Sequence, residues 1–192
     1  MTTDRAITSA LEALSAAFDE LGGPAMLIGG IAVIARGVPR TTLDIDATIS
    51  AERLDLDRAL ALFARHGLTP RIPDARPFAA AHQVLLLRHD ASGTPVDVTL
   101  ARLPFEMDAL ARATPVDFAG PRLLVATVED ILVYKAVAWR ERDRSDISRL
   151  LLAHEGEVDV DRVRSIVAEF AAALDEPERL AEFDALVARQ TR

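Results

Sequence analysis

Apolar residues recur at helical spacing near the start of the chain. Five of them are separated by four, three, four and three residues, so their side chains fall on one face of a helix. They are Ile7, Leu11, Leu14, Phe18 and Leu21. Gly22-Gly23-Pro24 follows, a combination that ends helices. The pattern therefore predicts an amphipathic helix over residues 3–21.

Short apolar runs then alternate with short helical patterns as far as residue 126. The predicted strands are 26–28, 43–49, 82–89 and 95–101, with one or two more within 116–125. The predicted helices are 31–36, 54–65 and 104–113. Residues 69–80 are rich in proline and arginine, and we expect a loop there, mobile over a site.

From Thr127 the pattern is helical to the end. Thr127 is followed three residues later by Asp130, which is typical of a capped helix start. Further helices are predicted at 147–152, 160–174 and 177–189. The chain therefore reads as a mixed α and β region, residues 1–126, followed by a helical region, residues 127–192, packed on it.

Composition narrows the class of protein. The chain has 192 residues and is 50% hydrophobic, enough for one sizeable domain or a core with a helical appendage. It has no cysteine, so disulfides, thiol nucleophiles and thiolate zinc sites are excluded. No apolar run is long enough to span a bilayer, and the N-terminus lacks the pattern of a signal peptide. We therefore expect a cytoplasmic protein without a membrane partner.

Charge argues against one broad function. The net charge of -8 disfavours a general nucleic-acid coat protein, because neutralising phosphates supplies most non-specific affinity. A local basic patch beside an acidic site stays compatible with that charge. Its candidate members are Arg36, Arg40, Arg71, Arg76, Arg140, Arg142 and Arg144.

The stretch from Gly29 to Asp46 carries the chemistry. Gly29 and Gly30 stand between an apolar strand and a short helix, where a backbone can come close to phosphates. Asp44 and Asp46 are two residues apart on a predicted strand and point to the same face. Their repulsion is relieved by a cation, and Mg²⁺ prefers carboxylates together with substrate phosphates. The other interpretation is an ordinary turn and the solvent face of an edge strand.

Lysine usage singles out one position. Of the 22 basic residues, only Lys135 is a lysine, which leaves 22 − 1 = 21 arginines. Its compact ammonium differs chemically from a planar guanidinium. The single lysine could have been retained by chance. The interpretation that we favour is that Lys135 is directed at phosphate.

Together these segments resemble the nucleotidyltransferase superfamily built on the DNA polymerase β-like fold. Ile28-Gly29-Gly30, a gap of thirteen residues and Asp44-Ile45-Asp46 match its signature. The resemblance implies an α+β (mixed α/β) fold, with a short mixed sheet flanked by helices and a helical C-terminal region. It also implies a third carboxylate on a later strand. Asp97 is the candidate, and the alternative that we favour less is a surface carboxylate of a hairpin.

Within that superfamily the chain looks most similar to AbiEii-type toxins. Arg40-Thr41-Thr42-Leu43-Asp44 departs slightly from their pattern, whereas Lys135 and Arg140 with Asp143 and Asp146 match the later segment. The acids of that segment could instead be ordinary helix-start residues. The implied catalytic residues are Asp44, Asp46, Asp97, Lys135 and Asp143. The implied nucleotide-binding residues are Gly29, Gly30, Arg40, Thr42 and Lys135.

The implied reaction transfers a nucleotidyl group from a nucleoside triphosphate to a hydroxyl acceptor and releases pyrophosphate. Asp44, Asp46 and Asp97 would hold Mg²⁺ or Mn²⁺. We expect an AbiEii-like toxin that acts on tRNA or another RNA, with an antitoxin protein as a partner. The alternatives are an enzyme that modifies a small molecule of the aminoglycoside type, and a catalytically silent nucleotide-binding or regulatory protein.

Overall fold

The computed structural model describes residues 3–52 and 54–190, and its contacts divide the chain into two compact units. The first comprises Met1–Ile31 with Thr41–Ala126, and the second comprises Ala32–Arg40 with Thr127–Arg192. The chain passes from the first unit to the second within α2 (Gly29–Ala35). The predicted mixed α and β fold is confirmed: every described strand belongs to the first unit, and the second is helical.

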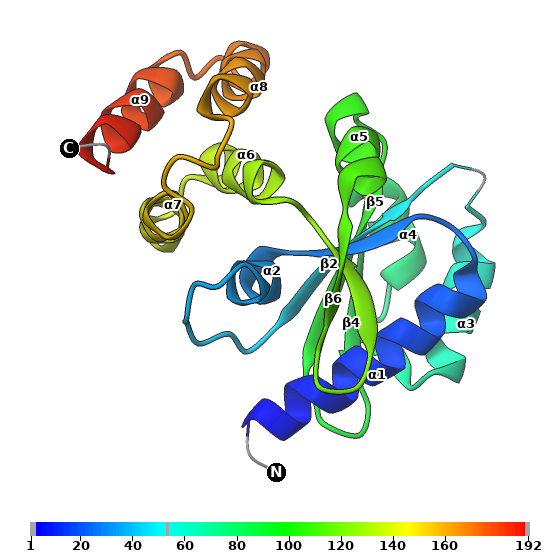
Figure 1. Cartoon of the computed structure of the whole chain (residues 1–192). Coiled ribbons are helices and arrows are strands. Elements are labelled where there is room, and N and C mark those ends of the chain that lie inside the picture. Colours follow the sequence, from blue (N-terminus) through cyan, green and yellow to red (C-terminus); the bar gives the residue numbers. More distant parts are fainter. Residues whose placement is uncertain (1–2, 53, 191–192) are drawn as a thin grey trace. The chain divides into compact units, whose positions relative to one another are not determined.

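The first unit contains a mixed sheet (Figure 1). Its strand order is β3-β4-β5-β2-β1-β7-β6. Its strands are β1 (Ala25–Ile28), β2 (Ile45–Ser50), β3 (Leu68–Pro70), β4 (Val84–His89), β5 (Pro95–Ala101), β6 (Thr114–Asp117) and β7 (Arg122–Val125). In β5, Val96, Val98 and Leu100 are at most 2% exposed. Since side chains alternate along a strand, the intervening Asp97 points to the opposite face.

The first unit also contains the helices α1 (Thr3–Leu21), α3 (Leu56–Arg65), α4 (Ala75–His82) and α5 (Pro104–Arg112). Helix α3 packs against α1 and α4, whereas α5 contacts strand β2. The predicted first helix is confirmed, and its stripe is buried at Leu11, Leu14 and Phe18. The Phe18 ring meets Phe63 of α3 edge to face, with 6.4 Å between ring centroids. Figure 1 shows α1 and α3 next to each other.

The predicted loop over residues 69–80 is wrong. Residues 68–70 form the edge strand β3, where Pro70 is tolerated because an edge residue needs no partner for its nitrogen. Residues 75–82 form α4, and Pro77 lies in its first turn, where proline costs no helical hydrogen bond. A composition rich in proline and arginine therefore concealed two regular elements.

The second unit contains α6 (Val128–Ala138), α7 (Glu141–Ala153), α8 (Val160–Ala173) and α9 (Glu178–Gln190). Thr127 caps α6 as predicted, since its Oγ1 accepts a hydrogen bond from the Asp130 nitrogen at 3.2 Å. The helix expected from Ile147 begins earlier, at Glu141. In residues 3–52 and 54–190, no helix has the length and apolar character needed to cross a membrane.

Candidate active site

Asp46 and Asp97 lie side by side on the central strands of the first unit. β2 and β5 run parallel, and the register sets Asp46 opposite Asp97. On the other side of β2, the antiparallel strand β1 sets Ile28 opposite Asp46, and Gly29 follows directly. Residues opposite each other project from the same face of a sheet. The register therefore assembles two predicted carboxylates and the first predicted glycine at one place.

Gly29 makes room for the Asp46 carboxylate. Its φ of +62° lies in the left-handed region, and a Cβ placed on it would be 2.0 Å from Asp46 Oδ2. Any side chain here would be strained and would displace that carboxylate. Gly30 is the next residue of α2 and is buried. The nearby Asp46 carboxylate therefore explains why residue 29 is a glycine. The predicted close approach of phosphate is a separate reason.

Thr42 orients Asp44, the first acid of the motif. Thr42 is only 8% exposed, and its hydroxyl donates a hydrogen bond to Asp44 Oδ1 at 2.8 Å. Asp44 directly precedes β2, in which Asp46 is the second residue. The predicted nucleotide-binding residue Thr42 therefore acts, in this structure, on the carboxylate that is predicted to bind metal.

Asp97 has a partner that the sequence did not reveal. Arg71 Nη1 lies 2.7 Å from Asp97 Oδ1, and Arg71 Nη2 donates to Oδ2 at 3.1 Å. Burial raises the pKa of the Asp97 carboxyl above its usual value, and the Asp44 carboxylate adds to this rise. Arg71 lowers the pKa and offsets only part of the burial effect. Arg71 was one of seven arginines in the predicted basic patch, and only the strand register distinguishes it from the others.

The donor chemistry of the three acids fits a hard divalent ion. Asp44, Asp46 and Asp97 offer only carboxylate oxygens, which Mg²⁺ and Mn²⁺ prefer. In the described part of the chain, however, no three His, Cys, Asp or Glu side chains are arranged so that they could hold a metal ion. Asp44 is bound to Thr42, and Asp97 is bound to Arg71. The donors are thus present while their carboxylates face other partners.

The remaining predicted residues belong to the second unit, where they form a buried ionic cluster. Lys135 Nζ lies 2.9 Å from Asp143 Oδ1 and 2.8 Å from Asp146 Oδ2. Arg40 Nη1 reaches the same Asp146 oxygen at 2.6 Å. All four side chains are between 5% and 14% exposed. The single lysine is therefore held between two carboxylates inside its own unit.

Asp143 has a second structural contact. Its Oδ2 accepts a hydrogen bond from the Arg140 nitrogen at 3.1 Å, at the beginning of α7. An acid at this position satisfies a backbone donor that the helix leaves without a partner. The structure therefore gives Asp143 the contacts of a helix-start residue and of a lysine counter-ion, while its catalytic role stays a prediction.

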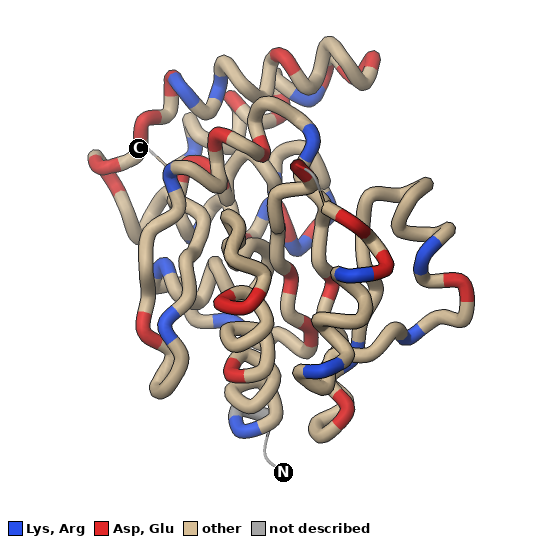
Figure 2. Tube along the Cα trace, turned by 90° about the vertical axis from the view of Figure 1, so that its right-hand side faces the viewer, with Lys and Arg blue, Asp and Glu red and all other residues tan. Residues whose placement is uncertain are grey.

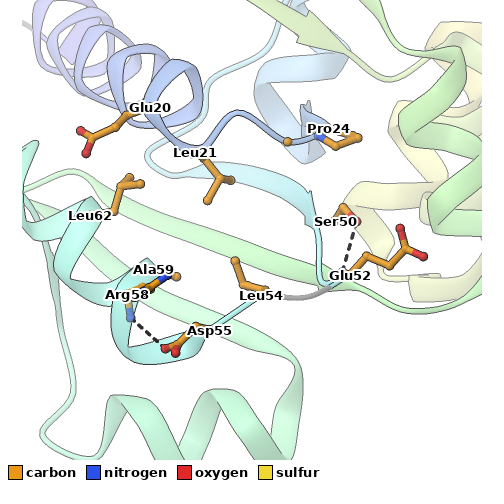
Figure 3. A pocket seen from close by; sticks show the side chains of 11 residues that line it. Glu20, Leu21, Pro24, Ser50, Glu52, Leu54, Asp55, Arg58, Ala59 and Leu62 are labelled. Carbon is orange, nitrogen blue, oxygen red and sulfur yellow. Dashed lines mark hydrogen bonds between the residues drawn. The ribbon is translucent and has the colours of Figure 1, made fainter.

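The first unit contains a pocket of about 480 Å³ (Figure 3). It is lined by Ser50, the last residue of β2, and not by Asp46 near the start of that strand. Ser50, its residue from β2, is four positions beyond Asp46, or about 13 Å along an extended strand. Leu21, Leu54 and Leu62 line it, and Glu20, Asp55 and Arg58 supply its charged side chains. None of the predicted site residues lines this pocket.

Comparison with known proteins agrees with the fold and with the class of reaction. Residues 5–190 match the family model DUF6036, described as a nucleotidyltransferase of unknown function. The chain belongs to this family, and the predicted nucleotidyltransferase class is confirmed. A comparison with curated proteins gives no match.

Solved structures show the same fold at low sequence identity. The antibiotic-resistance factor ANT(2'')-Ia in solution is 20% identical, with a TM-score of 0.61 over 95% of this chain and 99% of that one. Its complex with adenylyl-2''-tobramycin is 19% identical, with a TM-score of 0.57 over 91% and 99%. JHP933 from Helicobacter pylori is 11% identical, with a TM-score of 0.52 over 97% and 89%.

Proposed function

We propose that this protein transfers a nucleotidyl group from a nucleoside triphosphate to an acceptor hydroxyl and releases pyrophosphate. The observation that carries the proposal is the register that sets Asp46 beside Asp97. The missing side chain of Gly29 leaves room for the Asp46 carboxylate. Membership of a nucleotidyltransferase family supports the reaction class.

We assign Asp44, Asp46 and Asp97 to a divalent ion, Mg²⁺ or Mn²⁺. When bound, such an ion neutralises triphosphate oxygens and favours in-line displacement. Thr42 holds the Asp44 carboxylate in one orientation. Asp97, which the register sets beside Asp46, is the residue that we assign to activating the acceptor hydroxyl.

Roles for Arg40, Lys135 and Asp143 are proposals from the resemblance to AbiEii-type proteins. By that resemblance, Gly30, Arg40 and Lys135 would bind the triphosphate. Asp143 would hold the Lys135 ammonium in position. The contacts of Lys135 with Asp143 and Asp146 support a role in holding the second unit together as well. The two roles have different consequences for stability, so they can be separated by measurement.

The acceptor has two candidates. The AbiEii-like pattern around Arg40 and Lys135 supports an RNA, such as tRNA, and an antitoxin partner. The net charge of -8 favours instead a small cationic molecule with hydroxyl groups, since a polyanion is repelled by an acidic protein. Acidic and basic residues are interspersed along the trace, without one long basic block (Figure 2). A structure of the same fold holds adenylyl-2''-tobramycin, which also favours the second candidate.

The test offers both acceptors to the same protein. The wild type is incubated with Mg²⁺ or Mn²⁺ and each α-labelled nucleoside triphosphate, either with total RNA or with a panel of aminoglycosides. The double variant Asp44→Asn/Asp46→Asn should lose transfer, whereas Asp57→Asn, which changes an exposed carboxylate paired with Arg76, should keep it. Label on RNA supports the toxin-like version, and label on an aminoglycoside supports the small-molecule version. Nucleotide binding without transfer to anything would identify a silent member of the fold.

A further inference from the structure

Both terminal nitrogens of the Arg71 guanidinium lie close to the Asp97 carboxylate, and one of them forms a hydrogen bond with it. Nη1 lies 2.7 Å from Oδ1, and Nη2 lies 3.1 Å from Oδ2. The two side chains are 30% and 31% exposed, so the pair is only partly screened by water. The Nη2–Oδ2 contact is a charge-assisted hydrogen bond, whereas Asp97 Oδ1 is buried and accepts no hydrogen bond among the described residues, although Nη1 lies close to it. Each Asp97 oxygen therefore already faces a cationic nitrogen.

The sheet fixes this pair in place. The Arg71 nitrogen donates to the Leu86 carbonyl at 3.0 Å, one residue beyond the end of β3. Leu86 in turn stands opposite Asp97 in the antiparallel pair of β4 and β5. Arg71 and Asp97 thus occupy one row across the sheet, and Asp46 continues that row on β2. The guanidinium is aligned by backbone pairing and not by a chance surface contact.

This row has a consequence for metal binding. A divalent ion that takes Asp97 as a ligand needs at least one of its two oxygens. Both face Arg71, and two cations on one carboxylate repel each other. Building on the proposed function, we propose that Arg71 is the resident counter-ion of Asp97 and must leave before this carboxylate can bind metal. Arg71 thereby lowers the affinity of the free protein for divalent ions.

The test measures metal binding without nucleotide, so that it does not depend on catalysis. Free Mn²⁺ is titrated by electron paramagnetic resonance into the wild type, Arg71→Gln, Asp97→Asn and the double variant. Arg71→Gln should bind Mn²⁺ at least roughly tenfold more tightly, because a charge-assisted contact no longer competes. In the Asp97→Asn background, the same change should have no effect. Arg76→Gln serves as the matched control, because Arg76 pairs with the exposed Asp57 at 2.9 Å, and it should bind as the wild type does.

Several outcomes would overturn this assignment. They are unchanged or weaker Mn²⁺ binding in Arg71→Gln, an equal gain in the Asp97→Asn background, and absence of Mn²⁺ binding in every variant. Thermal unfolding of each variant shows whether it is folded, and Arg71→Lys keeps a positive charge if Arg71→Gln does not fold. Arg71→Lys should then bind Mn²⁺ more tightly than the wild type, because a single ammonium nitrogen cannot lie close to both Asp97 oxygens as the two guanidinium nitrogens do. If Arg71→Gln gains Mn²⁺ affinity while the wild type transfers no nucleotide, the proposed function fails and the role of Arg71 stands.

Discussion

Asp46 stands directly opposite Asp97 in the parallel pair of β2 and β5. The two acids are far apart in the sequence, and backbone pairing alone brings them together. Like charges so close are unfavourable unless a cation lies nearby. Arg71 supplies a cation on the Asp97 side, and the oxygen donors suit a divalent ion. Two adjacent carboxylates are typical of a cation-binding site. Without a cation, the same arrangement would destabilise the fold.

Gly29→Ala should disturb both stability and the carboxylate site. The new Cβ would meet Asp46 Oδ2 at 2.0 Å in a left-handed backbone, so we expect a loss of about 1–3 kcal/mol in unfolding free energy. Mn²⁺ affinity should fall roughly tenfold or more, because a ligand would be displaced. Urea unfolding and Mn²⁺ titration measure the two effects.

Gly67→Ala is the matched control for this prediction. Gly67 has a φ of +69°, yet a Cβ there would meet nothing within 4 Å. It should show the backbone strain without the change in Mn²⁺ affinity. If both variants bind Mn²⁺ equally well, Gly29 does not shape the site.

Lys135→Met should destabilise the protein by about 3–5 kcal/mol, because Asp143 would be left buried without its cation. The double variant Lys135→Met/Asp143→Asn should recover part of that loss, since it removes the unpaired charge as well. Urea unfolding gives these free energies. Arg164→Met, which breaks an exposed pair with Asp184, should change stability far less.

A different result would point to the phosphate role alone. If Lys135→Met leaves the unfolding free energy unchanged but weakens nucleotide binding, the ionic cluster is not structural. If Lys135→Met is destabilised and nucleotide binding per folded molecule is kept, the predicted contact with phosphate is wrong.

Asp97 should make stability depend on pH in an unusual direction. Its pKa is raised in the folded state, chiefly by burial, so the folded protein holds the Asp97 proton more tightly than the unfolded chain does. Stability from this group is therefore present below the ordinary pKa of 3.8 and is lost as the pH rises through the folded value. As the pH rises from 3.8 through the folded-state pKa, Asp97→Asn should become more stable relative to the wild type. This difference in stability should persist at higher pH.

Urea unfolding of the two proteins at a series of pH values, from about pH 3 to about pH 7, checks this sign. The Asp97→Asn advantage should be smallest at the acid end. A gap that widens toward acid would mean that Arg71 outweighs burial, so that the carboxylate is stabilised in its charged form.

The sequence predicted most of the helices because their apolar stripes repeat at helical spacing. The sequence also led us to expect Asp44 and Asp46 on one strand, but β2 begins at Ile45, so only Asp46 lies on the strand and Asp44 directly precedes it. The place of Asp97 followed from the resemblance and not from spacing, because the pairing of β2 with β5 is a long-range contact. Arg71 was not recognised as the partner of Asp97 for the same reason: its position depends on two successive strand pairings.

The surroundings of Lys135 were equally hidden from the sequence. Asp143 and Asp146 face it only because α6 and α7 pack together and α7 begins at Glu141. A helix beginning at Ile147 would have left both acids in a loop. Local patterns thus identified the charged residues, while the tertiary contacts decide which charges neutralise each other.

The proposed nucleotidyl transfer depends on Asp44 and Asp46. In the decisive experiment, the protein is incubated with Mg²⁺ and with an acceptor identified in the RNA and aminoglycoside assays. Parallel reactions contain a nucleoside triphosphate labelled either at the α-phosphate or at the γ-phosphate. We expect the α-label to move to the acceptor while the γ-label leaves as pyrophosphate in equal amount, and we expect Asp44→Asn/Asp46→Asn to show neither. Transfer of the γ-label to the acceptor, or undiminished α-label transfer by the double variant, would show that the chemistry or the site is different.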